Sequence, residues 1–156
     1  MRRVKALLEP LIDGPDEELF FAGLRAFEKL APERTKQRCL VSLGRESEDP
    51  SPAGLFYLLS LPLGSGVLPL LLTWLEGDRP LRNAITVARS LGKLVSPHRL
   101  QELCTQALAD ESPTLRLDAC RLLPLLDAED ARAIAGEAMK DEPDGGLRRK
   151  LERAAG

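Results

Sequence analysis

The chain has few of the residues on which enzymes and secreted proteins commonly depend. Aromatic residues make up 4% of its 156 positions, and there is one histidine. Its three cysteines, at positions 39, 104 and 120, are an odd number without metal-ligand spacing. We therefore expect reduced, partly buried thiols in a cytoplasmic protein rather than a disulfide framework. The net charge of −2 gives no global field that would attract nucleic acid or an anionic membrane.

Leucine and alanine supply most of the apolar content of the chain. Hydrophobic residues make up 44% of the sequence, which is enough to bury a core. A β-sandwich would need more β-branched and aromatic residues than this composition offers. The composition therefore predicts an all-α protein.

An acidic residue followed closely by proline recurs along the sequence. The aspartates of these marks are spaced by 36, 29, 32 and 31 residues. The five marks are Asp13–Pro15, Asp49–Pro52, Asp78–Pro80, Asp110–Pro113 and Asp141–Pro143. Aspartate and serine accept hydrogen bonds from the free amides of a first helical turn, and proline is tolerated there because its missing N–H would have no partner. Each mark therefore predicts the start of a helix.

A second helix start follows sixteen to nineteen residues after each of the first four marks. These second starts are Ala31–Pro32, Ser65–Gly66, Ser96–Pro97 and Asp127. Each unit is therefore predicted to be a helical hairpin, with a first helix A and a second helix B. The apolar positions of two B helices match at a constant offset of 31: Leu100, Leu103, Cys104, Ala107 and Leu108 correspond to Ala131, Ile134, Ala135, Ala138 and Met139. This match indicates an internal repeat.

The best-defined units resemble HEAT repeats. The residues that carry the resemblance are Asp78, Pro80, Leu81, Arg82, Ala84, Ala88, Leu91 and Gly92 in one unit and Asp110, Pro113, Leu115, Arg116, Ala119 and Leu122 in the next. The resemblance implies an α-solenoid of about four helical hairpins with terminal capping helices. The single domain 1–156 would comprise a leading helix at 2–12, repeats at 13–48, 49–77, 78–109 and 110–140, and a closing helix within 141–156.

The second repeat contains an unusual uncharged segment. No charged residue occurs in the 26 positions from Pro50 to Leu75. Three interpretations remain open: a well-buried hairpin, an exposed apolar patch, or a membrane span. The patch would be formed by Phe56, Tyr57, Leu71 and Trp74, and it would bind a protein partner or a second copy of the chain. The span is the least favoured interpretation, because prolines and glycines at 62–69 would break its helix.

A run of basic residues is the clearest charge feature. From Arg79 to Gln101 the chain has five basic residues and no acidic one. Arg82 and Arg116 occupy equivalent repeat positions, so we expect them to bridge neighbouring repeats. Arg89, Lys93 and Arg99 are then predicted to be available for an anionic partner.

The sequence predicts no catalytic, cofactor or metal site. His98 lies at a predicted helix start, and no cysteine shares its helical face. The paired carboxylates also lie at predicted helix starts, where the helix dipole favours negative charge, so they need no catalytic role.

These observations predict a non-enzymatic, cytoplasmic protein–protein interaction module or scaffold. The partner would lie along the surface formed by successive B helices, with the apolar patch as an anchor. The alternative is a nucleic-acid-binding HEAT-like protein of the DNA-repair type that uses the basic stripe, although the acidic balance of the chain disfavours it. The fold resemblance also admits tetrapyrrole handling, which no residue pattern supports. The N-terminal segment has only a short, interrupted apolar run, so no secretory signal is expected, and a membrane is not among the predicted partners.

Overall fold

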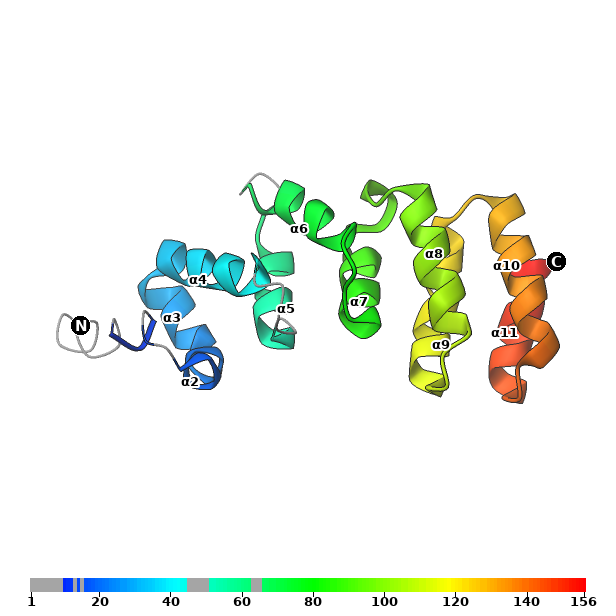
Figure 1. Cartoon of the computed structure of the whole chain (residues 1–156), viewed down its shortest axis with the longest axis horizontal. Coiled ribbons are helices and arrows are strands. Elements are labelled where there is room, and N and C mark those ends of the chain that lie inside the picture. Colours follow the sequence, from blue (N-terminus) through cyan, green and yellow to red (C-terminus); the bar gives the residue numbers. More distant parts are fainter. Residues whose placement is uncertain (1–9, 13, 15, 45–50, 63–65) are drawn as a thin grey trace. The chain divides into compact units, whose positions relative to one another are not determined.

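The structure is a computed structural model that describes residues 10–12, 14, 16–44, 51–62 and 66–156. Over these residues it is all-helical and contains no strand, which confirms the predicted class. The chain divides into two compact units, Met1–Trp74 and Leu75–Gly156. Figure 1 shows the helices of both units. The predicted leading helix at 2–12 lies outside the described residues except for residues 10–12, which are helical.

After the helical residues 10–12, the described part of the first unit contains five further helices. They are α2 (Glu17–Ala22), α3 (Leu24–Leu30), α4 (Pro32–Gly44), α5 (Pro52–Ser60) and α6 (Val67–Leu75), whose last residue belongs to the second unit. Successive helices from α2 to α5 contact one another. The start of α4 at Pro32 and that of α5 at Pro52 agree with the predicted marks.

The first A helix is interrupted, which the sequence did not predict. Gly23 ends α2 and precedes α3, where the Phe27 ring covers it so closely that a Cβ atom would lie 2.6 Å from Cε2 of that ring. The Phe27 ring also stacks on Phe20, with ring centroids 5.7 Å apart. Both aromatic side chains are buried. The interruption of the helix at Gly23 therefore allows the Phe20 and Phe27 rings to lie in the same core.

The second unit contains the two segments for which the sequence marks of a repeat are strongest. Its helices are α7 (Leu81–Leu91), η2 (Gly92–Leu94), α8 (Pro97–Leu108), α9 (Pro113–Cys120), η3 (Leu123–Leu125), α10 (Ala128–Asp141) and α11 (Gly145–Ala155). Side chains cap several of these helices as predicted. Ser96 Oγ accepts a hydrogen bond from Arg99 N, and Asp127 Oδ1 accepts one from Asp130 N.

The helix α9 is shorter than the apolar periodicity suggested. The spacing of Leu115, Ala119, Leu122 and Leu126 predicted one continuous helix, but α9 ends at Cys120 and a 3₁₀ turn follows. Pro124 explains the change, because proline lacks an N–H and clashes with the carbonyl four residues before it.

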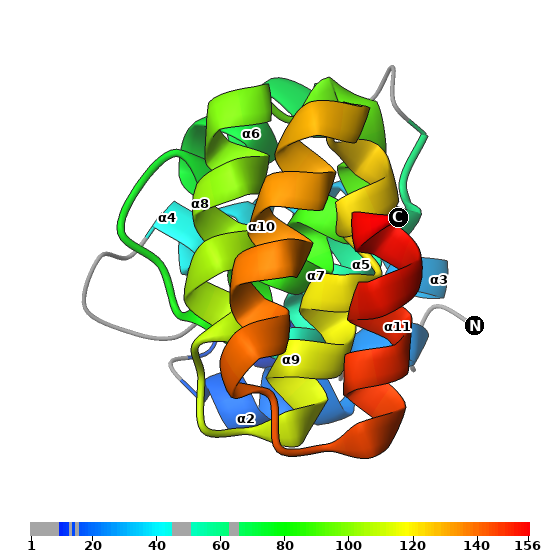
Figure 2. The ribbon, with the colours of Figure 1, turned by 90° about the vertical axis from the view of Figure 1, so that its right-hand side faces the viewer.

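Alternate helices of the second unit contact one another. The A-type helix α9 contacts both α7 and α11, and the B-type helices α8 and α10 contact each other (Figure 2). Within the predicted hairpins α7 contacts α8 and η3 contacts α10, while between them α8 contacts α9 and α10 contacts α11. Within this unit the helices therefore form two layers, with α8 and α10 side by side in one of them. The buried side chains between the layers are mainly leucine, alanine and other small apolar residues.

Candidate functional site: a groove between α8 and α10

A groove of about 670 Å³ runs between α8 and α10 on the B-helix layer of the second unit. This volume lies within the range of common ligand sites. Its lining is apolar along the middle and polar at one end. The lining residues are Thr105, Leu108, Ala109, Asp110, Arg116, Ala133, Ile134, Glu137, Ala138, Asp141, Glu142 and Pro143.

Small side chains keep the groove open. Ala109 and Ala133 are exposed and Ala138 is partly exposed, although all three belong to the lining. At the amino-terminal ends of the two helices, Gln101 Nε2 donates a hydrogen bond to an Asp130 carboxylate oxygen. The helices are therefore tied together at one end, while alanine leaves space between them further along.

The two helices run parallel, so their carboxyl-terminal ends lie at the same end of the groove. The Gln101–Asp130 hydrogen bond joins their first halves, and residues from their last turns line the groove together. Carbonyl groups without helical N–H partners collect at helix carboxyl ends and give them partial negative charge. This end of the groove therefore has a negative backbone contribution from two helices.

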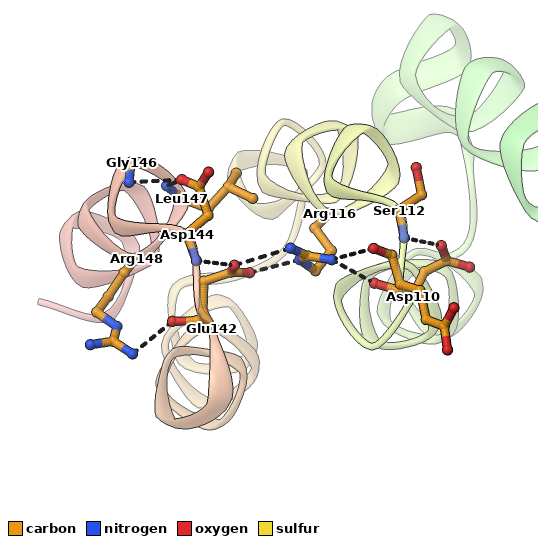
Figure 3. A network of polar contacts seen from close by, with 9 residues as sticks. Asp110, Ser112, Arg116, Glu142, Asp144, Gly146, Leu147 and Arg148 are labelled. Atoms are coloured by element: carbon orange, nitrogen blue, oxygen red, sulfur yellow. Dashed lines mark hydrogen bonds and ion pairs between the residues drawn. The ribbon is translucent and has the colours of Figure 1, made fainter.

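Arg116 fixes the polar end of the groove (Figure 3). Its Nε donates to Glu142 Oε2 at 2.9 Å, and its Nη1 donates to the backbone carbonyls of Asp110 at 3.0 Å and Glu111 at 2.8 Å. The Arg116 and Glu142 side chains are buried, so both charges depend on these contacts. The network connects α9 with the segments that follow α8 and α10.

The same network positions the start of α11. Glu142 Oε1 accepts a hydrogen bond from Asp144 N, and Asp144 Oδ1 accepts from the amides of Gly146 and Leu147, each at 2.8 Å. These backbone hydrogen bonds lower the pKa of the Asp144 carboxyl group, with a smaller contribution from the Arg116 charge. Arg148 donates to the Glu142 carbonyl at 2.7 Å (Figure 3).

Carboxylates dominate the charge around the groove. Asp110, Glu137 and Asp141 belong to the lining besides the buried Arg116–Glu142 pair. Glu137 forms an exposed ion pair with Lys140, which lies just outside the lining. Even with Lys140 counted, the acidic side chains exceed the basic ones by two. The groove therefore combines an apolar floor with a net negative rim.

The cysteines are protected rather than activated. Burial raises the pKa of the Cys39 thiol and of the Cys104 thiol to about 12, and it also raises that of Cys120. The thiols of Cys39 and Cys104 are therefore protonated at neutral pH. His98 is exposed on α8, with Nδ1 3.8 Å from Glu102 Oε1.

The predicted apolar patch is mostly buried. Tyr57, Leu71 and Trp74 retain 6%, 2% and 4% of their possible exposure, whereas Phe56 is 61% exposed. The Tyr57 hydroxyl donates to the Pro32 carbonyl at 3.4 Å, which holds α5 against the start of α4. The exposed surface expected from these four residues is therefore wrong for three of them, because their side chains belong to the core.

The predicted basic stripe, formed by Arg89, Lys93 and Arg99, contains both buried and exposed residues. Arg99 is buried, and it donates to the carbonyls of Leu75 at 2.8 Å and Gly77 at 2.9 Å. Arg89 forms an ion pair with Asp118 on α9 at 2.9 Å, and Lys93 is exposed. The expectation that Arg99 is available to a partner is therefore wrong, because neighbouring carbonyl groups hold its guanidinium.

Of the two arginines expected to bridge neighbouring repeats, Arg82 and Arg116, only Arg116 does so. Arg116 bridges neighbouring segments as predicted, but Arg82 is exposed, and Arg89 provides the link from α7 to α9. Sequence reasoning missed the groove between α8 and α10 altogether. The sequence carried a signal only in the acidic residues near the end of α10, because the exposure of Ala109 and Ala133 is visible only in the folded chain.

Comparisons with protein-family models, curated proteins and solved structures found no match to this chain. Within the described residues, every helix is too short or too polar to cross a membrane. In the same residues, no group of three or more histidine, cysteine, aspartate or glutamate side chains is arranged to hold a metal ion.

Proposed function

We propose that this protein is a non-enzymatic protein–protein interaction module built on HEAT-like helical repeats, and that a partner segment binds in the groove between α8 and α10. The observation that carries the proposal is the groove itself: about 670 Å³ of open space with an apolar floor between two packed helices. Grooves of this kind hold the side chains of peptide and protein ligands.

The contacts of the second unit support the repeat assignment. Helices of the same type contact across repeats, as α8 does with α10 and α9 with α11. Two arginines also cross the predicted repeat boundaries: Arg99 on α8 donates to the Leu75 and Gly77 carbonyls, and Arg116 on α9 donates to Glu142. Stacked hairpins in which each repeat contacts its neighbours are what a helical solenoid requires.

The chemistry of the titratable groups favours binding over catalysis. The raised pKa values of Cys39 and Cys104 disfavour the thiolates that a cysteine nucleophile needs. The carboxylates of Asp127 and Asp144 cap helices. The only histidine lies on the surface rather than in the groove.

The structure leaves few cations of the basic stripe available for the nucleic-acid alternative. Of the three cations proposed for an anionic partner, Arg99 is buried and Arg89 is neutralised by Asp118. Phosphate contacts need several available cations along one surface. The groove has the opposite charge, which favours a protein ligand over a polyanion.

A pair of tryptophan substitutions tests the proposal. Ala133 and Ala128 are both exposed alanines of α10, but only Ala133 lines the groove. Affinity capture from a native cell lysate should recover a specific protein with the wild type and with Ala128→Trp, and should lose it with Ala133→Trp. Partners that all three forms recover equally would show that the groove is not the binding site.

A further inference from the structure

We propose that the occupant of the groove is a short segment of a partner protein that combines aliphatic side chains with lysine or arginine. This inference rests on the proposed function and specifies its partner by chemistry. The aliphatic side chains would lie on Ala133, Ile134 and Ala138, and the cation would lie beside Asp110 and Asp141.

The charge of the lining selects a cationic partner. Asp141 is exposed and Asp110 is partly exposed at the same end of the groove. The only cation in the lining, Arg116, is already bound to Glu142 and to two carbonyl groups. A basic side chain would therefore meet carboxylates that no lining cation neutralises, whereas an acidic side chain would be repelled.

The helix ends add to this preference, and their contribution is reduced by Arg116 and Arg148, which donate to carbonyls just beyond them. The last turns of α8 and α10 lie together at the acidic end, and each contributes partial negative charge from its terminal carbonyls. This contribution does not depend on the carboxylate side chains. A cation at this end would interact with both the side chains and the backbone.

The dimensions of the lining limit the bound segment to a few residues. On α10 the lining extends from Ala133 to Asp141, which is about 12 Å at the rise of an α-helix. That length matches about two turns of a bound helix or about four extended residues. The alanines of the floor leave room for leucine-sized side chains along it.

Three labelled peptides test the charge preference directly. The probes are synthetic twelve-residue peptides with leucine at helical spacing. All remaining positions are lysine in the first peptide, glutamate in the second and glutamine in the third. Fluorescence anisotropy measures their binding to the intact chain. We expect the lysine peptide to bind at least tenfold more tightly than the glutamate peptide, and added salt should reduce that difference. Equal binding of the two charged peptides, or binding of neither, would overturn the inference.

A matched pair of charge reversals locates the effect. Asp141 and Glu129 are both exposed acidic residues of α10, but Glu129 lies outside the groove. Asp141→Lys should weaken binding of the lysine peptide about tenfold, and Glu129→Lys should leave it within about twofold. Equal losses in both variants would mean that only the overall charge of the protein matters, which would also overturn the inference.

The glutamine peptide separates this inference from the proposed function. If Ala133→Trp abolishes binding of the glutamine peptide while the lysine peptide has no advantage over it, the groove is a binding site and the cationic preference is wrong. If Ala133→Trp leaves binding of the lysine peptide unchanged, the peptide binds elsewhere and the inference fails at this site. Capture of a native partner with the tryptophan pair still decides the proposed function independently.

Discussion

Arg116 on α9 and Glu142 after α10 form a buried ion pair, with Arg116 Nε 2.9 Å from Glu142 Oε2. The two residues are separated by 26 positions in the sequence, and the pair spans the polar end of the groove. Because the same guanidinium also binds the carbonyls of Asp110 and Glu111, one side chain connects three segments of the second unit. The shape of the groove end therefore depends on this pair.

Removal of one partner of this pair should destabilise the protein strongly. Glu142→Ala leaves the buried Arg116 charge without its carboxylate, which costs about 3–5 kcal/mol in comparable buried pairs. Glu111→Ala is the control, because Glu111 contributes only its backbone carbonyl to Arg116. Urea unfolding followed by circular dichroism measures both variants.

The double replacement Arg116→Met/Glu142→Leu sharpens this test. Apolar side chains of similar volume often replace a buried ion pair with little loss of stability. The double variant should therefore be more stable than Glu142→Ala alone. A double variant at least as unstable as the single one would mean that the carbonyl contacts of Arg116, rather than its charge pairing, hold this end of the groove.

Arg99 and Lys93 should respond differently to truncation although the sequence placed them in the same stripe. Arg99→Ala removes the donors that satisfy the Leu75 and Gly77 carbonyls, and it should lower the free energy of unfolding by about 2 kcal/mol or more. Lys93 is exposed, so Lys93→Ala should change it by less than about 0.5 kcal/mol. Thermal unfolding of the two variants in parallel provides the measurement, and equal effects would contradict a structural role for Arg99.

Acid should weaken the start of α11 through Asp144. The pKa of this carboxyl group is lowered in the folded state by the amides of Leu147 and Gly146, so its contribution is present above the ordinary value of 3.8. That contribution is lost as the pH falls through the lower, folded-state pKa. Asp144→Asn keeps a capping side chain without a titrating group, and it should flatten the fall in stability below about pH 4. An unchanged acid profile would show that Asp144 does not contribute to it.

The sequence predicted where helices start more accurately than it predicted which side chains are exposed. The starts of α8 at Pro97 and of α9 at Pro113 were predicted because capping depends on adjacent residues. The burial of Arg99 was missed, and that of Trp74 was left open, because both depend on segments that come together only in the folded chain. Arg99, for example, binds a carbonyl 24 positions away.

The groove was missed for a different physical reason. It arises from an absence of side-chain volume at Ala109 and Ala133, and alanine is common in any packed helix. The sequence aligned Leu108 with Met139 as equivalent apolar positions, yet periodicity alone does not tell which small residues face a neighbouring helix and which line open space.

Two glycines of the second unit should respond to alanine in opposite directions. Gly92 ends α7 with φ 57° and ψ −129°, a conformation that residues with a Cβ atom rarely adopt. Gly136 lies inside α10, where an added Cβ would meet nothing within 4 Å. Gly92→Ala should therefore destabilise the protein by about 1–3 kcal/mol, whereas Gly136→Ala should stabilise it by about 0.5–1 kcal/mol.

Denaturant unfolding of the two glycine variants provides the measurement, and each variant is the control for the other because both add one methyl group. If both substitutions stabilise the protein, the turn after α7 does not require the glycine conformation, and the exit from that helix is set by Pro97 and the Ser96 cap instead. If both destabilise it, α10 packs more closely around Gly136 than the structure indicates. The predicted opposite signs would support both the sharp end of α7 and the open surface of α10 beside the groove.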